Sequence, residues 1–154
     1  MAVCERIEHE VGVRCCTSVL ALNEIMKKTA RRRFGLVTPY LHDVWTAIVQ
    51  NYAHHGFECV AERHLDQSVN FSFAELTSAQ ISAMAREVTA ALPQCLTTFC
   101  TNLHAAQLAP ALEAELGRPL YNTLSTAVWT ALRLCGVGTC QVTGWESLFQ
   151  DTIE

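Results

Sequence analysis

Residues 34–40 read FGLVTPY, a short apolar run that ends in a Thr-Pro-Tyr turn. Pro39 disfavours helical backbone at the residue before it, and its own fixed φ suits the start of a helix. Beyond the turn, apolar side chains recur at helical spacing from Val44 to Tyr52, and Gly56 then favours a helix end. The stretch therefore predicts a buried strand, a turn and an amphipathic helix, in that order.

The same alternation of short apolar runs and longer amphipathic segments extends along the whole chain. The other runs of strand length are residues 13–17, 57–61, 95–100 and 119–122. Further segments with helical spacing are residues 19–26, 77–92, 108–116 and 128–134, and a small apolar cluster at 145–149 predicts a short docking helix. Strands that alternate with helices are typical of a parallel sheet. We therefore predict an α/β fold: a doubly wound parallel sheet with Rossmann- or flavodoxin-like layers.

Length and composition fit one globular domain over residues 1–154. Half of the residues are hydrophobic, 17% are charged, and the formal net charge is −4, which gives no sign of a nucleic-acid partner or of an anionic membrane surface. No apolar run approaches the ~18 residues of a membrane helix. The first residues, MAVCERIEHEVGV, lack the basic and apolar regions of a secretory signal, so we expect a cytoplasmic protein.

The chain contains eight cysteines, and several of them lie inside apolar runs. In a cytoplasmic chain of this length we expect reduced thiols, most of them buried. Neither the cysteines nor the six histidines show the spacing of a metal site, so no metal is expected. Glycine-rich phosphate-binding motifs and the GxSxG motif are also missing from the sequence, which leaves nucleotide-binding and serine-hydrolase functions without support.

Ligands of open parallel sheets bind at the carboxyl ends of the strands, so the residues that follow each apolar run are the candidate site. Cys100, Thr101 and Asn102 follow one predicted strand and precede a predicted helix. A thiol beside a helix N-terminus is favoured as thiolate, and Thr101 and Asn102 are suited either to capping that helix or to binding a carboxylate. A buried structural cysteine beside a cap explains the same residues equally well.

Three other predicted strands end in residues of similar chemistry. Tyr40 follows the run at residues 34–38, Thr123 follows the last run, and Thr17 and Ser18 stand at the end of residues 13–17. Helix capping or surface packing is the simpler explanation for each of them. Cys16 precedes Thr17 as Cys100 precedes Thr101, which makes Cys16 a second candidate thiol.

Taken together and in order, five of these strings resemble one enzyme superfamily. They are ERIE at residues 5–8 with the Gly-Val and Thr-Ser pairs at 12–13 and 17–18, FGLVTPY at 34–40, FECVA at 57–61 with Asn70, FCTNL at 99–103, and LGRPLYNTLSTAVW at 116–129. The chain resembles the aspartate/glutamate racemase superfamily, in the branch of maleate isomerases and arylmalonate decarboxylases. The likeness runs from about residue 5 to about residue 137.

The resemblance implies an enzyme without cofactors that isomerises or racemises small carboxylates, with two cysteines facing each other across a cleft between two pseudosymmetric halves. Cys100 matches the cysteine of the second half, and Thr101 and Asn102 match carboxylate-binding positions beside it. Tyr40 and Asn70 match side chains that reach the substrate. Further substrate contacts are expected from three residues at the ends of the first and last runs, Thr17, Ser18 and Thr123.

The resemblance also implies that part of the first half is missing. The family's other cysteine precedes the ERIE segment, with which this chain begins, and Cys16 stands where the family has a threonine. Residues 34–122 then form the second lobe, and residues 1–33 and 123–154 would pack on the absent first lobe. Two other functions stay open: an arylmalonate-type decarboxylase, which can work with the second-half cysteine alone, and a truncated, non-catalytic ligand-binding or assembly module. A homo-oligomer is possible, because missing strands would expose apolar surface.

Overall fold

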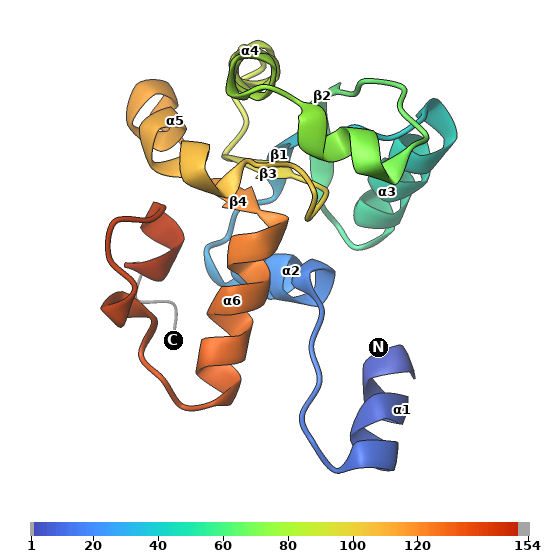
Figure 1. The fold of residues 1–154 in the computed structure, drawn as a ribbon, viewed down its shortest axis with the longest axis vertical. Helices are drawn as coiled ribbons and strands as arrows, with labels where there is room; N and C mark the ends of the chain where they lie inside the picture. Colours follow the sequence, from blue (N-terminus) through green and yellow to red (C-terminus); the bar gives the residue numbers. More distant parts are fainter. Residues whose placement is uncertain (1, 151–154) are drawn as a thin grey trace.

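The computed structural model describes residues 2–150, which form one parallel sheet with helices on both faces (Figure 1). The strands are β1 (Arg33–Val37), β2 (Glu58–Arg63), β3 (Cys95–Thr98) and β4 (Leu120–Asn122). The α-helices are α1 (Ala2–Val11), α2 (Ser18–Lys28), α3 (His42–His54), α4 (Ser78–Thr89), α5 (Ala109–Leu116) and α6 (Thr123–Leu134). Short 3-10 helices are η1 (Asn70–Glu75), η2 (Ala106–Leu108), η3 (Thr139–Gln141) and η4 (Ser147–Phe149).

The strand order is β2-β1-β3-β4, and every pair is parallel. Because the chain reverses its direction of travel through the sheet after β2, the carboxyl ends of the central strands β1 and β3 lie side by side, with Val37 paired to Thr98. The predicted doubly wound parallel sheet is confirmed. Its carboxyl edge is the place where ligands of such sheets bind.

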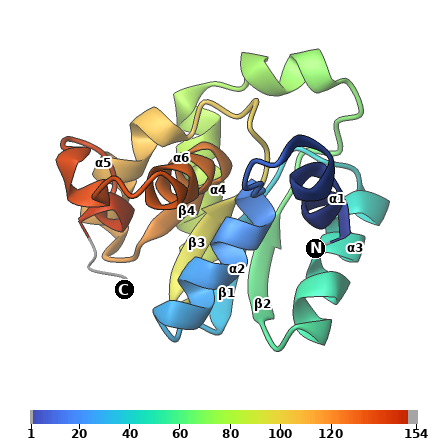
Figure 2. The same ribbon diagram turned by 90° about the horizontal axis from the view of Figure 1, so that it is seen from below.

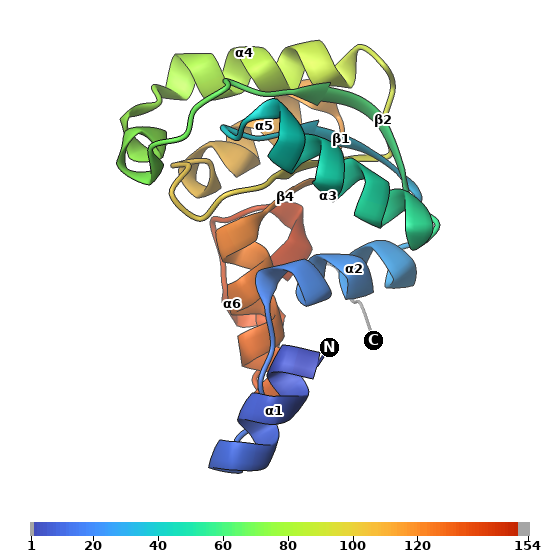
Figure 3. The same ribbon diagram turned by 90° about the vertical axis from the view of Figure 1, so that its right-hand side faces the viewer.

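Helices cover both faces of the sheet, as alternation along the strands requires. Phe34 and Leu36 of β1 point into a core with α2, α3 and α6, whereas Val37 packs with α4 and α5 on the other face. Figure 3 shows α4 and α2 on opposite sides of the sheet, and Figure 2 shows α2 and α6 next to each other on their shared face. Residues 1–33 and 123–154 thus supply α2 and α6, which cover one face of this sheet.

Close packing of α4 on the sheet depends on Gly35 in β1. A Cβ atom at this position would lie 2.9 Å from Leu96 Cδ2 and nearer still to Val88 Cγ1 of α4. Only glycine leaves room for α4 at its present distance from the strand.

Residues 13–17 were predicted to form a strand, and this prediction is wrong. The segment is a loop between α1 and α2, and Val13 is 65% exposed. Its backbone is satisfied locally, since the Cys15 N–H donates to the Glu8 carboxylate at 2.7 Å, and Thr17 caps α2 by accepting from the Leu20 N–H at 3.1 Å. A segment whose backbone groups already have local hydrogen bonds does not need a neighbouring strand. The apolar pattern of five residues does not reveal such bonds.

The cysteines and the tail follow the predictions in part. All eight thiols are free, but only Cys4, Cys95 and Cys100 are buried, and Cys135 and Cys140 are exposed. The apolar tail cluster docks through η4, where Leu148 and Phe149 join the core below α6.

Candidate functional site

The turn after β1 is tied to the end of β3. The Thr38 hydroxyl donates to the Phe99 carbonyl at 3.3 Å, and the Pro39 carbonyl accepts from the Gln67 N–H at 2.9 Å. Thr38 therefore joins two strands instead of capping α3, whose N-cap is Leu41. These bonds fix the backbone from which the Tyr40 side chain extends.

Cys100 lies directly beyond the end of β3 and is 7% exposed. Its backbone N–H donates to the Thr123 hydroxyl at 3.1 Å, and that hydroxyl donates to the Thr98 carbonyl at 2.6 Å. Thr123, at the start of α6, thus hydrogen-bonds to both sequence neighbours of Phe99. The position of the thiol follows from β3 and α6 together.

Tyr40 packs against the buried cluster that contains Cys100, Phe73 and Leu103. Burial, together with the hydrogen bond and the charge of Cys100, raises the pKa of Tyr40 to about 12. Phe73 of η1 packs edge-on against the Tyr40 ring, with ring centroids 5.6 Å apart. The phenol therefore stays protonated at neutral pH and can donate a hydrogen bond.

Asn70 and Asn102 form a second pair at the same edge of the sheet. The Asn102 side-chain amide donates to the Asn70 side-chain carbonyl at 3.0 Å and to its backbone carbonyl at 3.3 Å. Asn102 is half-buried, and Thr101 beside it is exposed. The pair links η1 to the segment that carries Cys100.

The expectation that a helix begins directly after Cys100 is wrong. Turns follow Cys100, η2 begins only at Ala106, and α5 begins at Ala109 with Leu108 as its N-cap. Thr101 and Asn102 cap no helix here. The helix end that Cys100 does meet is the N-terminus of α6, where Thr123 accepts its backbone N–H.

Thr17 and Ser18 approach this edge through α6. The Ser18 carbonyl accepts from the Thr126 hydroxyl at 3.3 Å, and Thr126 lies one turn after Thr123. Thr17 is exposed and caps α2, and Cys16 is half-buried in the preceding loop. The structure thus joins Tyr40, Cys100 and Thr123 in one cluster and Asn70 with Asn102 in another, with Thr17 and Ser18 beside the start of α6.

Sequence reasoning missed three residues of this edge: Thr38, Thr98 and Phe73. Thr38 and Thr98 stand at paired strand ends, a position that only the strand order reveals. Phe73 belongs to an FSF string at residues 71–73, and this string was the one available signal of a packed segment.

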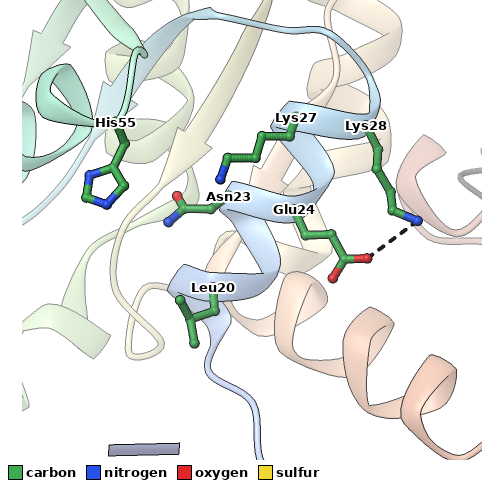
Figure 4. Close-up of a pocket in the computed structure, with 6 residues that line it drawn as sticks. All are labelled: Leu20, Asn23, Glu24, Lys27, Lys28 and His55. Carbon is green, nitrogen blue, oxygen red and sulfur yellow. Dashed lines mark ion pairs between the residues drawn. The ribbon is translucent and has the colours of Figure 1, made fainter. Parts of the chain in front are cut away.

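A hollow of about 580 Å³ lies elsewhere, along α2 (Figure 4). It is lined by Leu20, Asn23, Glu24, Lys27 and Lys28 of α2 and by His55. Glu24 and Lys28 form an ion pair of 3.6 Å across one helical turn. None of these residues belongs to the strand-end clusters, and the chemistry of the hollow is that of an ordinary solvated helix face.

Within residues 2–150, no three His, Cys, Asp or Glu side chains are grouped so as to hold a metal ion. The same part of the chain has no helix long and apolar enough to cross a membrane. The strand ends offer a thiol, a phenol that stays neutral, and small amide and hydroxyl donors. The thiol can transfer a proton or, as thiolate, add to a carbon atom, and the donors can bind an anion.

The fold and this cluster define the chain as a parallel α/β protein with a cysteine at the carboxyl edge of its sheet. The family model of arylmalonate decarboxylase matches residues 1–149. The chain therefore belongs to the arylmalonate decarboxylase family, within the superfamily that its motifs resemble. No curated protein sequence matches the chain significantly.

Several solved structures share the fold. An arylmalonate decarboxylase mutant in a liganded form has a TM-score of 0.88 at 23% identity, over 96% of this chain and 64% of that chain. The maleate isomerase Iso from Pseudomonas putida S16 has a TM-score of 0.87 at 20% identity, over 95% of this chain and 61% of that chain.

A mutant maleate cis-trans isomerase from Nocardia farcinica, with a covalently bound succinylcysteine intermediate, has a TM-score of 0.82 at 24% identity. The match covers 88% of this chain and 56% of that one. The chain thus spans between about half and two thirds of the length of these structures.

Proposed function

We propose that this chain carries the cysteine site of an enzyme that acts on small carboxylates without a cofactor, and that Cys100 is the reacting group. The observation that supports the proposal best is the position of the buried Cys100 at the carboxyl edge of the sheet, in a cluster against which Tyr40 packs. A thiol that reacts at a carbon atom needs a fixed position and a nearby hydrogen-bond donor. Thr123 fixes the backbone of Cys100, and Tyr40 supplies the donor.

The carboxylate of the substrate would bind to the small donors around this contact. A carbanion beside a carboxylate is stabilised when preorganised N–H and O–H groups surround the oxygens on which its charge develops. Tyr40 would donate its phenolic O–H. The other substrate contacts proposed are Asn70, Thr101, Asn102, Thr17, Ser18 and Thr123, whose hydroxyl already donates to the Thr98 carbonyl.

Membership of the arylmalonate decarboxylase family favours decarboxylation as one reaction. The bond between the substrate carbon and one carboxylate breaks, CO₂ leaves, and the electron pair stays on the substrate as an enediolate. The Cys100 thiol then donates its proton to that carbon, and water returns a proton to the thiolate. One cysteine is enough for this sequence.

Likeness in fold to the two maleate isomerases supports cis–trans isomerisation as the second candidate. The Cys100 thiolate would add to one carbon of the double bond, and the carbon–carbon bond, now single, would rotate. Elimination of the thiolate then restores the double bond in the other geometry. No net oxidation occurs in either reaction.

Incubation of the chain with phenylmalonate and with maleate, followed by proton NMR, tests the proposal. We expect turnover of one of the two and a loss of about 10²- to 10⁴-fold in rate for Cys100→Ser. The exposed Cys135→Ser variant is the matched control and should keep its rate. Turnover that survives Cys100→Ser would contradict the role of Cys100.

Failure to convert either compound would overturn the catalytic proposal for this chain. Carboxylate binding at Cys100 without turnover would then favour the third candidate, a non-catalytic ligand-binding module.

The cellular setting is also a proposal. Eight free cysteines suit the reducing cytoplasm better than an oxidising compartment.

A homo-oligomer is also proposed, because α1 exposes apolar side chains. The division into a lobe at residues 34–122, with flanks that pack on a first lobe, stays a prediction.

A further inference from the structure

A buried carboxyl group, that of Glu146, lies behind the cysteine site. Glu146 comes directly before η4 in the C-terminal tail and is 0% exposed. The Asn122 side-chain amide donates to Glu146 Oε1 at 2.7 Å. The tail thus places an acid against the junction of β4 and α6.

Asn122 is both the last residue of β4 and the N-cap of α6. Its side-chain carbonyl accepts from the Ser125 N–H at 2.9 Å, while its NH₂ group donates to Glu146 and, at 2.8 Å, to the Ser125 hydroxyl. An amide has donors at one end and an acceptor at the other. A carboxylate that accepts from the NH₂ group therefore holds the amide in the orientation that caps α6.

The next residue is Thr123, which bonds the Cys100 N–H and the Thr98 carbonyl. Asn122 itself pairs with Thr98 in the sheet. The orientation of the Asn122 side chain and the placement of the Thr123 hydroxyl are consequently set at one backbone junction. A continuous set of contacts leads from Glu146 to the backbone of Cys100.

A second acid fixes the tail that carries Glu146. The Glu113 carboxylate of α5 accepts from the Ser147 N–H at 2.7 Å, from its hydroxyl at 3.0 Å and from the Leu120 N–H at 2.8 Å. Burial raises the pKa of Glu146, and the negative charge of Glu113 acts in the same direction. Glu146 Oε2 is buried and has no hydrogen-bond partner among the described residues, so burial of this acid carries a desolvation cost that its bond to Asn122 offsets only in part.

We propose that Glu146 is a positioning residue for Cys100: its carboxyl group orients Asn122, and through Thr123 it fixes the Cys100 backbone against Tyr40. The importance of this positioning for turnover rests on the function proposed above, but the positioning itself does not. Glu146 touches none of the reacting groups, so it acts only through its neighbours.

The test compares Glu146→Ala and Glu146→Gln with a control, Ser147→Ala, which loosens the tail at Glu113 without touching Asn122. One readout is the titration of Tyr40 followed by NMR of ¹³C-labelled tyrosine. The other is the malonate concentration that halves the alkylation rate of Cys100, measured by mass spectrometry. Exposed Cys135 and Cys140 in the same molecule are the reference thiols.

We expect Glu146→Ala to lower the pKa of Tyr40 towards its ordinary value and to raise the half-protecting malonate concentration on the order of tenfold, because the thiol moves relative to its partners. Glu146→Gln keeps an acceptor for Asn122 and should stay near wild type. If Glu146→Ala fails to fold, Glu146→Asp, which withdraws the carboxyl group by one methylene, should show the same changes at smaller size.

Equal behaviour of Glu146→Ala and Ser147→Ala in both readouts would overturn the inference and leave Glu146 as a structural group of the tail. Lack of malonate protection in the wild type would overturn the proposed function instead. In that case the Tyr40 titration still decides whether Glu146 positions Cys100.

Discussion

Cys100 is one reason why the pKa of the Tyr40 phenol is raised. Burial is the largest cause, and the hydrogen bond and charge of Cys100 add to it. The hydroxyls of Thr38 and Thr123 hydrogen-bond to the backbone at Phe99 and Cys100 and hold this segment in place. The protonation of Tyr40 therefore reports directly on the geometry of the site.

Removal of the thiol should change the titration of the phenol. In Cys100→Ala we expect the pKa of Tyr40 to fall below about 12 but to stay above 10, since burial remains. At pH 11 most Tyr40 should be protonated in the wild type and more of it ionised in the variant. NMR of ¹³C-labelled tyrosine separates Tyr40 from Tyr52 and Tyr121, and an unchanged titration would show that the two groups are not in contact.

At the scale of elements, β1 and α4 approach each other closely only because residue 35 is glycine. Gly35→Ala places a methyl group against Val88 and Leu96 and should destabilise the fold by about 1–3 kcal/mol. Gly138→Ala is the control, because its Cβ meets atoms no nearer than 3.8 Å. Urea unfolding followed by tryptophan fluorescence measures both variants. Equal stabilities of the two variants would mean that α4 packs less closely than described.

The attachment of the tail should weaken as pH rises. Burial raises the pKa of Glu146, so its neutral form is favoured in the folded state, whereas the unfolded chain ionises near about 4.3. The stabilisation is full below that value and is lost as pH rises through the higher pKa of the folded state. Glu146→Gln cannot titrate, so the free energy of unfolding of the wild type should fall relative to that of the variant between pH 4 and pH 8. A constant difference over this range would contradict a raised pKa.

The sequence predicted the regular elements better than it predicted the surroundings of Cys100. Four of the five apolar runs are strands, because each carries side chains for a buried face, and helices α2 to α6 match the segments of helical spacing, whereas α1 was not among those segments. Residues 13–17 failed because Glu8 and the cap of α2 satisfy that segment locally. Apolar composition alone does not reveal such bonds.

The candidate site was predictable where it depends on strand ends and unpredictable where it depends on distant contacts. Tyr40 and Cys100 could be named because each follows a strand, and parallel strands share one carboxyl edge. Thr123 was expected as a donor to substrate, but its bonds to Cys100 and Thr98 depend on the register of β3 and β4. The buried Glu146 gave no signal at all, since its partners lie 21 or more positions earlier in the chain.

At the scale of the whole molecule, α1 stands apart from the sheet, beyond α2 and α6 (Figures 1 and 3). Val3, Ile7 and Val11 recur every four residues and are 67%, 43% and 61% exposed. An apolar stripe of this kind favours association. The chain should self-associate with rising concentration in sedimentation experiments, and Ile7→Lys should weaken this association.

The matched control for that experiment is His9→Lys, which adds a lysine elsewhere on α1, at an exposed position outside the apolar stripe. A chain that stays monomeric at all concentrations, or one that responds equally to both variants, would show that the stripe does not mediate association.

Protection of Cys100 by a small dicarboxylate decides whether the end of β3 is a carboxylate site. Iodoacetamide labels the chain with and without malonate, and mass spectrometry gives a rate for each of the eight cysteines. A carboxylate site at Cys100 predicts that malonate slows the labelling of Cys100 and leaves exposed Cys135 and Cys140 unchanged. Labelling of Cys100 at the same rate with and without malonate would contradict a carboxylate site at the end of β3.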